Sequence, residues 1–222
     1  MKNKSTEDYL KKIFGLSRKI DKVTTSAIAD SMNISSASVT DMIKKLSELD
    51  FLSYTPYQGV RLTKKGEKLA LKVIRRHRLL ELFLVEALHF SWDKVHEEAD
   101  RLEHVISDDF EHGIDKYLGM PKYDPHGDPI PTLDGEIEEV DYHKLAEMEA
   151  GDTCQIIRVT DSQRLLQLMQ KIDVGLNSTL VVKEKEIFDG SIVVKINGKK
   201  EHFLSREVAS NIFVKKAGKT WH

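Results

Sequence analysis

The first third of the chain alternates short helical patterns with breaks. Apolar residues recur at helical spacing, which predicts helices over residues 5–17, 25–32 and 36–49. Two β-like runs then flank the pair Gln58-Gly59, an arrangement typical of a turn between strands. Three helices followed by a hairpin form a winged helix-turn-helix, and we expect this domain over residues 1–65.

The helical period continues beyond this hairpin. It predicts long helices over residues 63–88 and 92–118, followed by an irregular tether rich in proline and glycine. A short helical turn is expected within 136–146. We interpret residues 66–146 as a helical domain whose long helices pair across a dimer. The apolar residues expected to supply that contact, with some of them serving the internal core instead, are Val73, Leu79, Leu82, Phe83, Val85, Leu88 and Trp92.

From Gly151 onward, apolar and polar residues alternate along the chain, as they do in β-strands. Turn signals at Asp189-Gly190 and Asn197-Gly198 separate short apolar runs. The pattern over residues 147–222 therefore predicts a small β-barrel. For the whole chain, the predicted fold class is mainly α with β. Strands are expected within 154–159, 179–187, 191–196, 201–204 and 211–216, and one helix within 161–172.

The composition is that of a folded globular protein. Hydrophobic residues make up 40% and charged residues 32% of the 222 residues, which argues against a disordered chain. No apolar run is long enough for a membrane helix, and the first residues lack the apolar core of a signal peptide. The single cysteine, Cys154, excludes an internal disulfide and a zinc site with several cysteines. We expect a cytoplasmic protein without membrane contact.

The net charge of −2 conceals three blocks of different sign. Residues 1–80 carry 17 basic and 8 acidic side chains, whereas residues 81–150 carry 5 and 20. Residues 151–222 carry 12 and 8. A basic block at one end indicates nucleic-acid contact. The acidic block holds six of the nine histidines, a combination that favours cations.

The second helix of a helix-turn-helix enters the DNA major groove, and its first residues reach base edges. Here that helix opens with small hydroxyl side chains, which permit a close approach. No Arg or Asn stands at its start, so DNA shape contributes to recognition. The alternative is a protein-contact module whose serines only cap the helix. The candidate DNA-binding residues are Ser35, Ser36, Ala37, Ser38, Thr40 and Lys44, with Arg61 and Lys64 at the wing and its exit.

A second constellation predicts a metal site. His96, Asp100, Glu103 and His104 have the spacing of one helix face, and the preceding helix carries His77 and Glu81 four residues apart. Carboxylates and imidazoles on two facing helices are how helical bundles build metal sites. Nitrogen and oxygen donors without thiolate suit Mn²⁺, Fe²⁺, Co²⁺ or Zn²⁺. The alternative is a solvated charged face with packed histidines.

These residues carry a family resemblance. The stretches H-R-L-L-E at 77–81, K-V-H-E-E-A-D-R-L-E-H-V-I-S-D at 94–108 and G-D-P-I-P at 127–131 resemble the metal-dependent repressors typified by the diphtheria toxin repressor and the manganese transport regulator. The start Glu7-Asp8-Tyr9-Leu10 is also similar. The resemblance implies a homodimer that binds a palindromic operator in double-stranded DNA when loaded with Fe²⁺ or Mn²⁺. It also implies two metals per subunit and an SH3-like carboxy-terminal domain of the FeoA type.

Carried over by position, the resemblance assigns two ligand sets. The primary set is Asp8, Asp100, Glu103 and His104. The ancillary set is His77, Glu81 and His96, with a contribution from the SH3-like domain. The matching positions in that domain hold Thr160 and Gln163; Gln163 is carried over, and Asp161, which stands beside Thr160, is added as a further candidate.

Three departures from the family pattern matter. Asp8 and Asp100 stand where the iron type has Met and Cys, and hard oxygen favours Mn²⁺. Lys11 stands where the small manganese regulators have Glu, which argues against their closely spaced metal pair. Asp124 and Asp128 stand at the iron type's anion site, so we expect no anion there.

The resulting hypothesis is a metal-dependent repressor of metal-uptake genes, not an enzyme and without a small-molecule substrate. Metal joining Asp8 to the acidic block would fix the DNA-binding geometry. Two alternatives stay open: a di-metal carboxylate enzyme, and a metal-buffering adaptor without DNA binding. The sequence has no nucleophile motif and no phosphate-binding Gly-rich loop. An enzymatic function would also not explain why basic and acidic residues are concentrated in different segments of the chain.

Overall fold

The computed structural model describes residues 4–55 and 59–217, so Gln58 of the expected hairpin turn lies outside the described residues. The chain divides into two compact units. Unit 1 comprises Met1–Leu80, Ala99–Met120 and Ile130–Ile137, and unit 2 comprises Glu81–Glu98, Pro121–Pro129 and Glu138–His222. The boundaries expected after residues 65 and 146 stay predictions.

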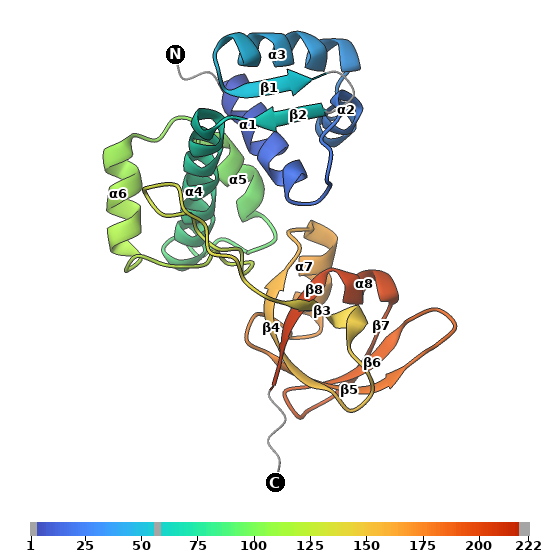
Figure 1. Ribbon diagram of the computed structural model, residues 1–222. Coiled ribbons are helices and arrows are strands. Elements are labelled where there is room, and N and C mark those ends of the chain that lie inside the picture. Colours follow the sequence, from blue (N-terminus) through green and yellow to red (C-terminus); the bar gives the residue numbers. More distant parts are fainter. Residues whose placement is uncertain (1–3, 56–58, 218–222) are drawn as a thin grey trace. The chain divides into compact units, whose positions relative to one another are not determined.

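Unit 1 begins with three helices and a two-stranded antiparallel sheet (Figure 1). Asn33 ends the second helix in the left-handed region, with φ of 53°, and Ser35 caps the third by accepting from the Ser38 amide. The apolar stripes of all three helices meet in one core. These elements are α1 (Lys4–Ser17), α2 (Thr25–Met32), α3 (Ser36–Glu48), β1 (Leu52–Thr55) and β2 (Gly59–Leu62).

The helices that follow differ from expectation in one respect. The expected helix over 92–118 is wrong as a single element, because the structure has α5 (Val95–Leu102) and α6 (Asp108–Tyr117). Ser107 has extended backbone angles and accepts from the Phe110 amide, so it caps a new helix rather than continuing the old one. Acidic residues in the first turn of α6 favour that start. The long helix α4 (Lys64–Glu86) agrees with its expected span.

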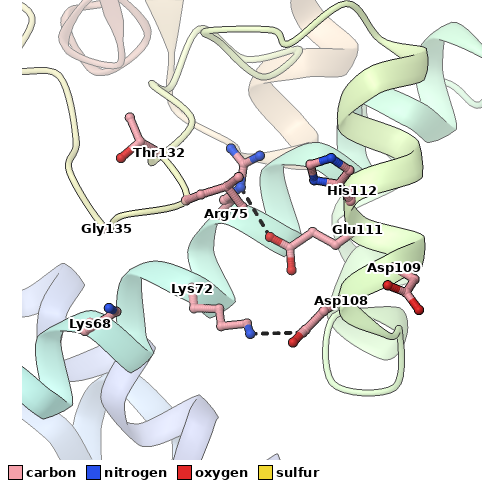
Figure 2. Close-up of a pocket in the computed structure, with 10 residues that line it drawn as sticks. Lys68, Lys72, Arg75, Asp108, Asp109, Glu111, His112, Thr132 and Gly135 are labelled. Atoms are coloured by element: carbon pink, nitrogen blue, oxygen red, sulfur yellow. Dashed lines mark ion pairs between the residues drawn. The ribbon is translucent and has the colours of Figure 1, made fainter.

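Buried ion pairs fasten α6 to α4 within unit 1. Arg75 contacts Glu111 at 3.2 Å and Asp115 at 2.7 Å, and Arg76 contacts Glu111 at 2.8 Å. Figure 2 shows the Arg75–Glu111 pair in a pocket that the loop over 132–135 also lines. Removing one partner of such a pair costs ~3–5 kcal/mol because a buried charge stays behind. The network therefore holds α6 in one place.

Several apolar residues of α4 serve the protomer rather than a dimer. Val73 and Leu79 are each 1% exposed in the described chain, so these two are among the residues that serve the internal core. Leu82, Phe83 and Val85 are partly exposed. Among the described residues, none of the helices is long and apolar enough to cross a membrane.

Unit 2 is built on a six-stranded antiparallel sheet with strand order β3-β8-β4-β5-β6-β7. Alternate residues Ile192, Val194 and Ile196 of β6 point into the core, as the sequence pattern predicts. Asn197 and Gly198 both have positive φ, which the expected hairpin turn requires. The strands are β3 (His143–Lys144), β4 (Thr153–Val159), β5 (Thr179–Lys185), β6 (Ile192–Ile196), β7 (Glu201–Leu204) and β8 (Ile212–Lys216).

Three short helices accompany this sheet: η1 (Leu145–Glu147), α7 (Gln163–Lys171) and α8 (Arg206–Ser210). The sequence predicted α7 but not α8, which has one turn and is capped by Ser205. Such a short element has too few residues for a helical period to be visible. The fold class predicted from the sequence, mainly α with a β domain, is confirmed.

Candidate metal centres and nucleic-acid interface

The candidate DNA-reading surface is the start of α3. Ser36, Ala37, Ser38, Thr40 and Lys44 are all exposed, while Val39 and Ile43 of the opposite face are buried. The side chain of Ser35 caps the helix, and the Thr40 hydroxyl donates to the Ser36 carbonyl at 2.8 Å. The Ser36 and Ala37 side chains can therefore approach a base edge most directly. Arg61 on β2 and Lys64 at the start of α4 are also exposed.

We call Asp8, Glu103 and His104 centre A; their donor atoms lie close enough to hold one metal ion. His104 Nε2 lies 2.8 Å from Asp8 Oδ1 and 3.2 Å from Glu103 Oε1. On the other side of the ring, His104 Nδ1 lies 2.6 Å from Glu7 Oε2. A proton on Nδ1 donates to this carboxylate, which aims the Nε2 lone pair at Asp8 and Glu103. A carboxylate behind the imidazole is the usual way to orient a metal-binding histidine.

Centre A fits a divalent cation. His104 Nε2 is buried, and within the described chain no group meets hydrogen-bond geometry with it. A buried, unsatisfied nitrogen is costly unless a further partner satisfies it. Burial raises the pKa of the Asp8 carboxyl, the His104 imidazole lowers it and the Glu103 carboxylate raises it again. A cation bound here would relieve the repulsion between the two carboxylates.

Glu103 and His104 do not lie on the helix that the spacing predicted. Helix α5 ends at Leu102, and both residues stand in the turn that follows it. The side chain of Asp100, still on the helix, lies 2.9 Å from the Lys11 ammonium and 3.3 Å from His77 Nδ1. Asp100 is therefore not in the cluster of Asp8, Glu103 and His104, and its place in the primary set stays a prediction.

A second cluster lies in unit 2. We call Glu81, His96, His126 and Asp161 centre B. His96 Nδ1 lies 3.2 Å from Glu81 Oε1 and 2.5 Å from Asp161 Oδ2. His126 Nδ1 lies 3.8 Å from Glu81 Oε2, and its Nε2 lies 3.9 Å from Asp161 Oδ1. Glu81 and His126 are buried.

The position of His126 depends on how its loop meets β4. The backbone of His126 accepts from the Val159 amide at 2.9 Å, beside a β-bulge between Ile156 and Arg158. Gly127 has φ of 87°, and a Cβ there would lie 2.1 Å from the Ile157 carbonyl. Asp124 Oδ1 accepts from the His126 and Asp128 amides and closes the turn. Only glycine permits this close approach of the loop to the strand.

Centre B also has the donors for a divalent cation. His126 Nε2 hydrogen-bonds to the Trp92 carbonyl at 3.0 Å, so the proton sits on Nε2 and the Nδ1 lone pair faces Glu81. Hydrogen bonds to Asp161 and Glu81 raise the pKa of the His96 imidazole to about 10. His96 thus carries a proton that a metal ion would displace.

The sequence-predicted ancillary residues are distributed between the two units. His77 belongs to unit 1, where its Nδ1 lies 2.6 Å from Glu103 Oε2. Glu81 and His96 belong to unit 2 together with Asp161. Gln163 is the exposed first residue of α7, whereas the carboxylate of Asp161, two residues earlier, meets His96.

Sequence reasoning missed three residues of these clusters: Glu7, Lys11 as a direct contact, and His126. His126 stands between two aspartates in a loop of prolines and glycine, and that local density of donors was the available signal. Glu7 had no such signal, because one acidic residue at a helix start is ordinary.

Family models match three segments of the chain. Residues 1–60 match the iron-dependent repressor, N-terminal DNA-binding domain, and residues 63–132 match the iron-dependent repressor, metal-binding and dimerisation domain. Residues 143–216 match the FeoA domain. The chain is 30% identical over 185 residues to a diphtheria toxin repressor of Corynebacterium jeikeium, covering 82% of this chain and 77% of that protein. It is 29% identical over 223 residues to the iron-dependent repressor IdeR of Mycobacterium tuberculosis, covering 96% and 97%.

Solved structures agree with these sequence matches. A manganese-dependent transcriptional repressor in complex with manganese has a TM-score of 0.89 and 37% identity, covering 96% of this chain and 100% of that one. The manganese regulator SloR has a TM-score of 0.77 and 35% identity, covering 96% and 98%. ScaR with bound Zn²⁺ has a TM-score of 0.80 and 33% identity, covering 96% and 99%.

Fold, clusters and matches define a class: a metal-dependent DNA-binding transcriptional regulator rather than an enzyme. More narrowly, the chain belongs to the iron-dependent repressor family that includes the diphtheria toxin repressors. The resemblance drawn from the sequence is therefore confirmed, and the alternative of a di-metal enzyme is excluded.

Proposed function

We propose that this chain is a homodimeric repressor that Mn²⁺ activates, with one ion in centre A and one in centre B of each subunit. Its target is a palindromic operator near metal-uptake genes, and it acts in the cytoplasm. The observation that carries the proposal is the buried His104 Nε2, held by Glu7 and aimed at two carboxylates without a hydrogen bond.

The donor sets support manganese over softer metals. Both centres offer imidazole nitrogen and carboxylate oxygen. The chain's only cysteine, Cys154, is buried in β4, and burial raises the pKa of its thiol to about 11. Hard oxygen donors without thiolate suit Mn²⁺, and Fe²⁺ is the runner-up.

Coupling between metal and DNA rests on the position of Asp8. Asp8 lies on α1, a helix of the winged-helix domain, whereas Glu103 and His104 follow α5. Two carboxylates this close repel each other, which disfavours their approach in the metal-free protein. A divalent ion supplies the positive charge that offsets this repulsion. Its binding energy then selects the state in which α1 and the residues after α5 meet, the DNA-competent arrangement in this proposal.

A dimer surface is available on unit 1. Val105, Phe110, Tyr117 and Met120 are 50–75% exposed and lie on or beside α6. Large apolar side chains exposed on one segment are candidates for an interaction site. This segment also falls within the matched dimerisation domain, which supports a role in pairing two copies.

The decisive experiment measures operator affinity and metal together. Fluorescence anisotropy with the protein's own promoter DNA is expected to show tight binding with Mn²⁺ and weak binding with a chelator. His104→Ala should weaken the Mn²⁺-dependent binding by about 100-fold or more, because a ligand and its oriented lone pair are lost. His143→Ala, an exposed histidine on β3, is the matched control and should behave like the wild type.

Two outcomes would contradict the proposal. One is equal DNA affinity with Mn²⁺ and with chelator. The other is a monomer in sedimentation at micromolar concentration with Mn²⁺ present.

A further inference from the structure

The ammonium of Lys11 sits in a cluster of ligand-type atoms beside centre A. Its Nζ lies 2.9 Å from Asp100 Oδ1 and 3.0 Å from His77 Nδ1. It also lies 2.8 and 3.1 Å from the two oxygens of Glu103. The Lys11 side chain is 23% exposed and that of Glu103 only 1%. A lysine at an ordinary helix surface would instead extend its charge into water.

The groups around Lys11 are a cation-binding set in their own right. They comprise one imidazole nitrogen and two carboxylates, the same donors as in centre A. Glu103 belongs to both places. Its Oε1 lies 3.2 Å from His104 Nε2, and its Oε2 lies 2.6 Å from His77 Nδ1. Two cation positions therefore share one buried carboxylate.

We propose that the Lys11 ammonium is a tethered cation that fills the position formed by His77, Asp100 and Glu103, so that centre A takes a single divalent ion. Lys11 thereby determines the number of metal ions and, by binding Asp100 and Glu103, prepares the metal-free protein for the first one. This inference rests on the proposed metal binding at centre A. It adds that Lys11 limits the number of metal ions bound there to one.

Charge gives the physical reason. Four carboxylates surround the two positions: Glu7, Asp8, Asp100 and Glu103. One divalent ion together with Lys11 supplies three positive charges, which leaves the group close to neutral. A second divalent ion beside the ammonium would raise the positive charge to five, and the ammonium would also occupy its place. A neutral side chain without the terminal Nζ removes both obstacles, the charge and the atom that occupies the place.

Lys11→Met tests this, because methionine keeps an unbranched side chain but has no charge. Equilibrium dialysis against Mn²⁺ with elemental analysis should find one more ion per chain in this variant than in the wild type. The two ions would then share Glu103, so their electron paramagnetic resonance signal per ion should fall through magnetic coupling. Lys12→Met is the matched control: Lys12 is the next residue of α1 and is exposed, and its loss should change neither readout.

Two further variants separate charge from shape. Lys11→Arg keeps a positive charge and should retain the wild-type ion count. Lys11→Gln removes the charge but retains a hydrogen-bond donor, and should bind the additional ion as Lys11→Met does. Without metal, both neutral variants should unfold at a lower temperature than Lys12→Met, and Mn²⁺ should restore more of the difference than it does for the control.

The outcomes are distinct for the two proposals. A wild type that binds no Mn²⁺ would overturn the proposed function. A wild type that binds Mn²⁺, with the same ion count in Lys11→Met and Lys11→Gln, would overturn the inference about Lys11 alone. If Lys11→Met does not fold without metal, it can be prepared with Mn²⁺ present and counted after dialysis, and Lys11→Gln provides the independent measurement.

Discussion

Centre A and centre B use the same chemical groups but differ in how the protein prepares them. In centre A the histidine is held by a buried carboxylate, and a lysine ammonium contacts Glu103. In centre B a loop supplies His126, and His96 holds a proton between two carboxylates. The orientation of His104 is fixed by Glu7 before an ion binds, whereas the proton on His96 makes binding at centre B dependent on pH. The comparison indicates that the two centres fill under different conditions.

Among the variants that test this difference between the centres, Glu7→Gln should have the largest effect on metal affinity. The amide would accept the His104 Nδ1–H less strongly, and the imidazole would lose its orienting charge. We expect ~10–100-fold weaker Mn²⁺ binding at centre A, the usual range for such a partner, and little change at centre B.

Isothermal titration of each centre would measure the Glu7→Gln effect. Glu48→Gln, an exposed acidic residue at the end of α3, is the control. An equal loss at both centres would contradict the separate roles assigned to them.

A smaller, graded effect is expected from pH at centre B. The pKa of His96 is raised to about 10 by Asp161 and Glu81, so below that pH the imidazole is protonated in the metal-free protein. Metal requires the neutral ring, so raising the pH favours binding. Affinity should increase about tenfold per pH unit over the neutral range, with about one proton released per ion.

Calorimetry in buffers of different ionisation enthalpy would count that proton. The titration uses the His104→Ala background, in which centre B binds alone. His96→Gln should abolish the proton release along with most of the affinity. Binding at centre B without net proton release in the His104→Ala protein would show that His96 is not a ligand.

The smallest effect on affinity should come from Gly127→Ala. A Cβ 2.1 Å from the Ile157 carbonyl, on a residue with φ of 87°, forces the loop away from β4. We expect a free energy of unfolding lowered by ~1–3 kcal/mol and a few-fold loss of affinity at centre B.

Gly151→Ala distinguishes the effect of backbone strain from the effect of a steric clash between the loop and β4. Gly151 has φ of 92°, but no atom lies within 4 Å of the position that a Cβ would take, so this variant reports the backbone strain alone. Denaturant unfolding and metal titration would compare the two variants. If both lower metal affinity at centre B equally, the close approach of the loop does not position His126.

Much of the fold could be predicted because it depends on near neighbours in the chain. The helix spans around 25–32 and 36–48 follow from apolar spacing and from caps such as Ser35. The break at Ser107 was missed because the apolar period continues across it and only the local cap ends the helix. The turn at Asn197-Gly198 was predictable because both residues tolerate positive φ.

The candidate centres were predictable by residue type but not by grouping. His104 and Asp8 were expected together, and the structure brings them within 2.8 Å. Asp100 was expected with them, yet its carboxylate faces Lys11. His126 was not expected at all, because a loop histidine has no spacing relation to Glu81 or Asp161.

By itself, the sequence determined the winged helix, the segregation of charge and the supply of nitrogen and oxygen donors, because these depend on composition and local periodicity. Only the tertiary structure decided which donors meet. Lys11 and Glu103, which are in contact, lie 92 positions apart in the sequence. The position of His126 depends on a bulge in β4. Such contacts follow from the packing of segments that are distant in the sequence, and no local pattern of residues predicts them.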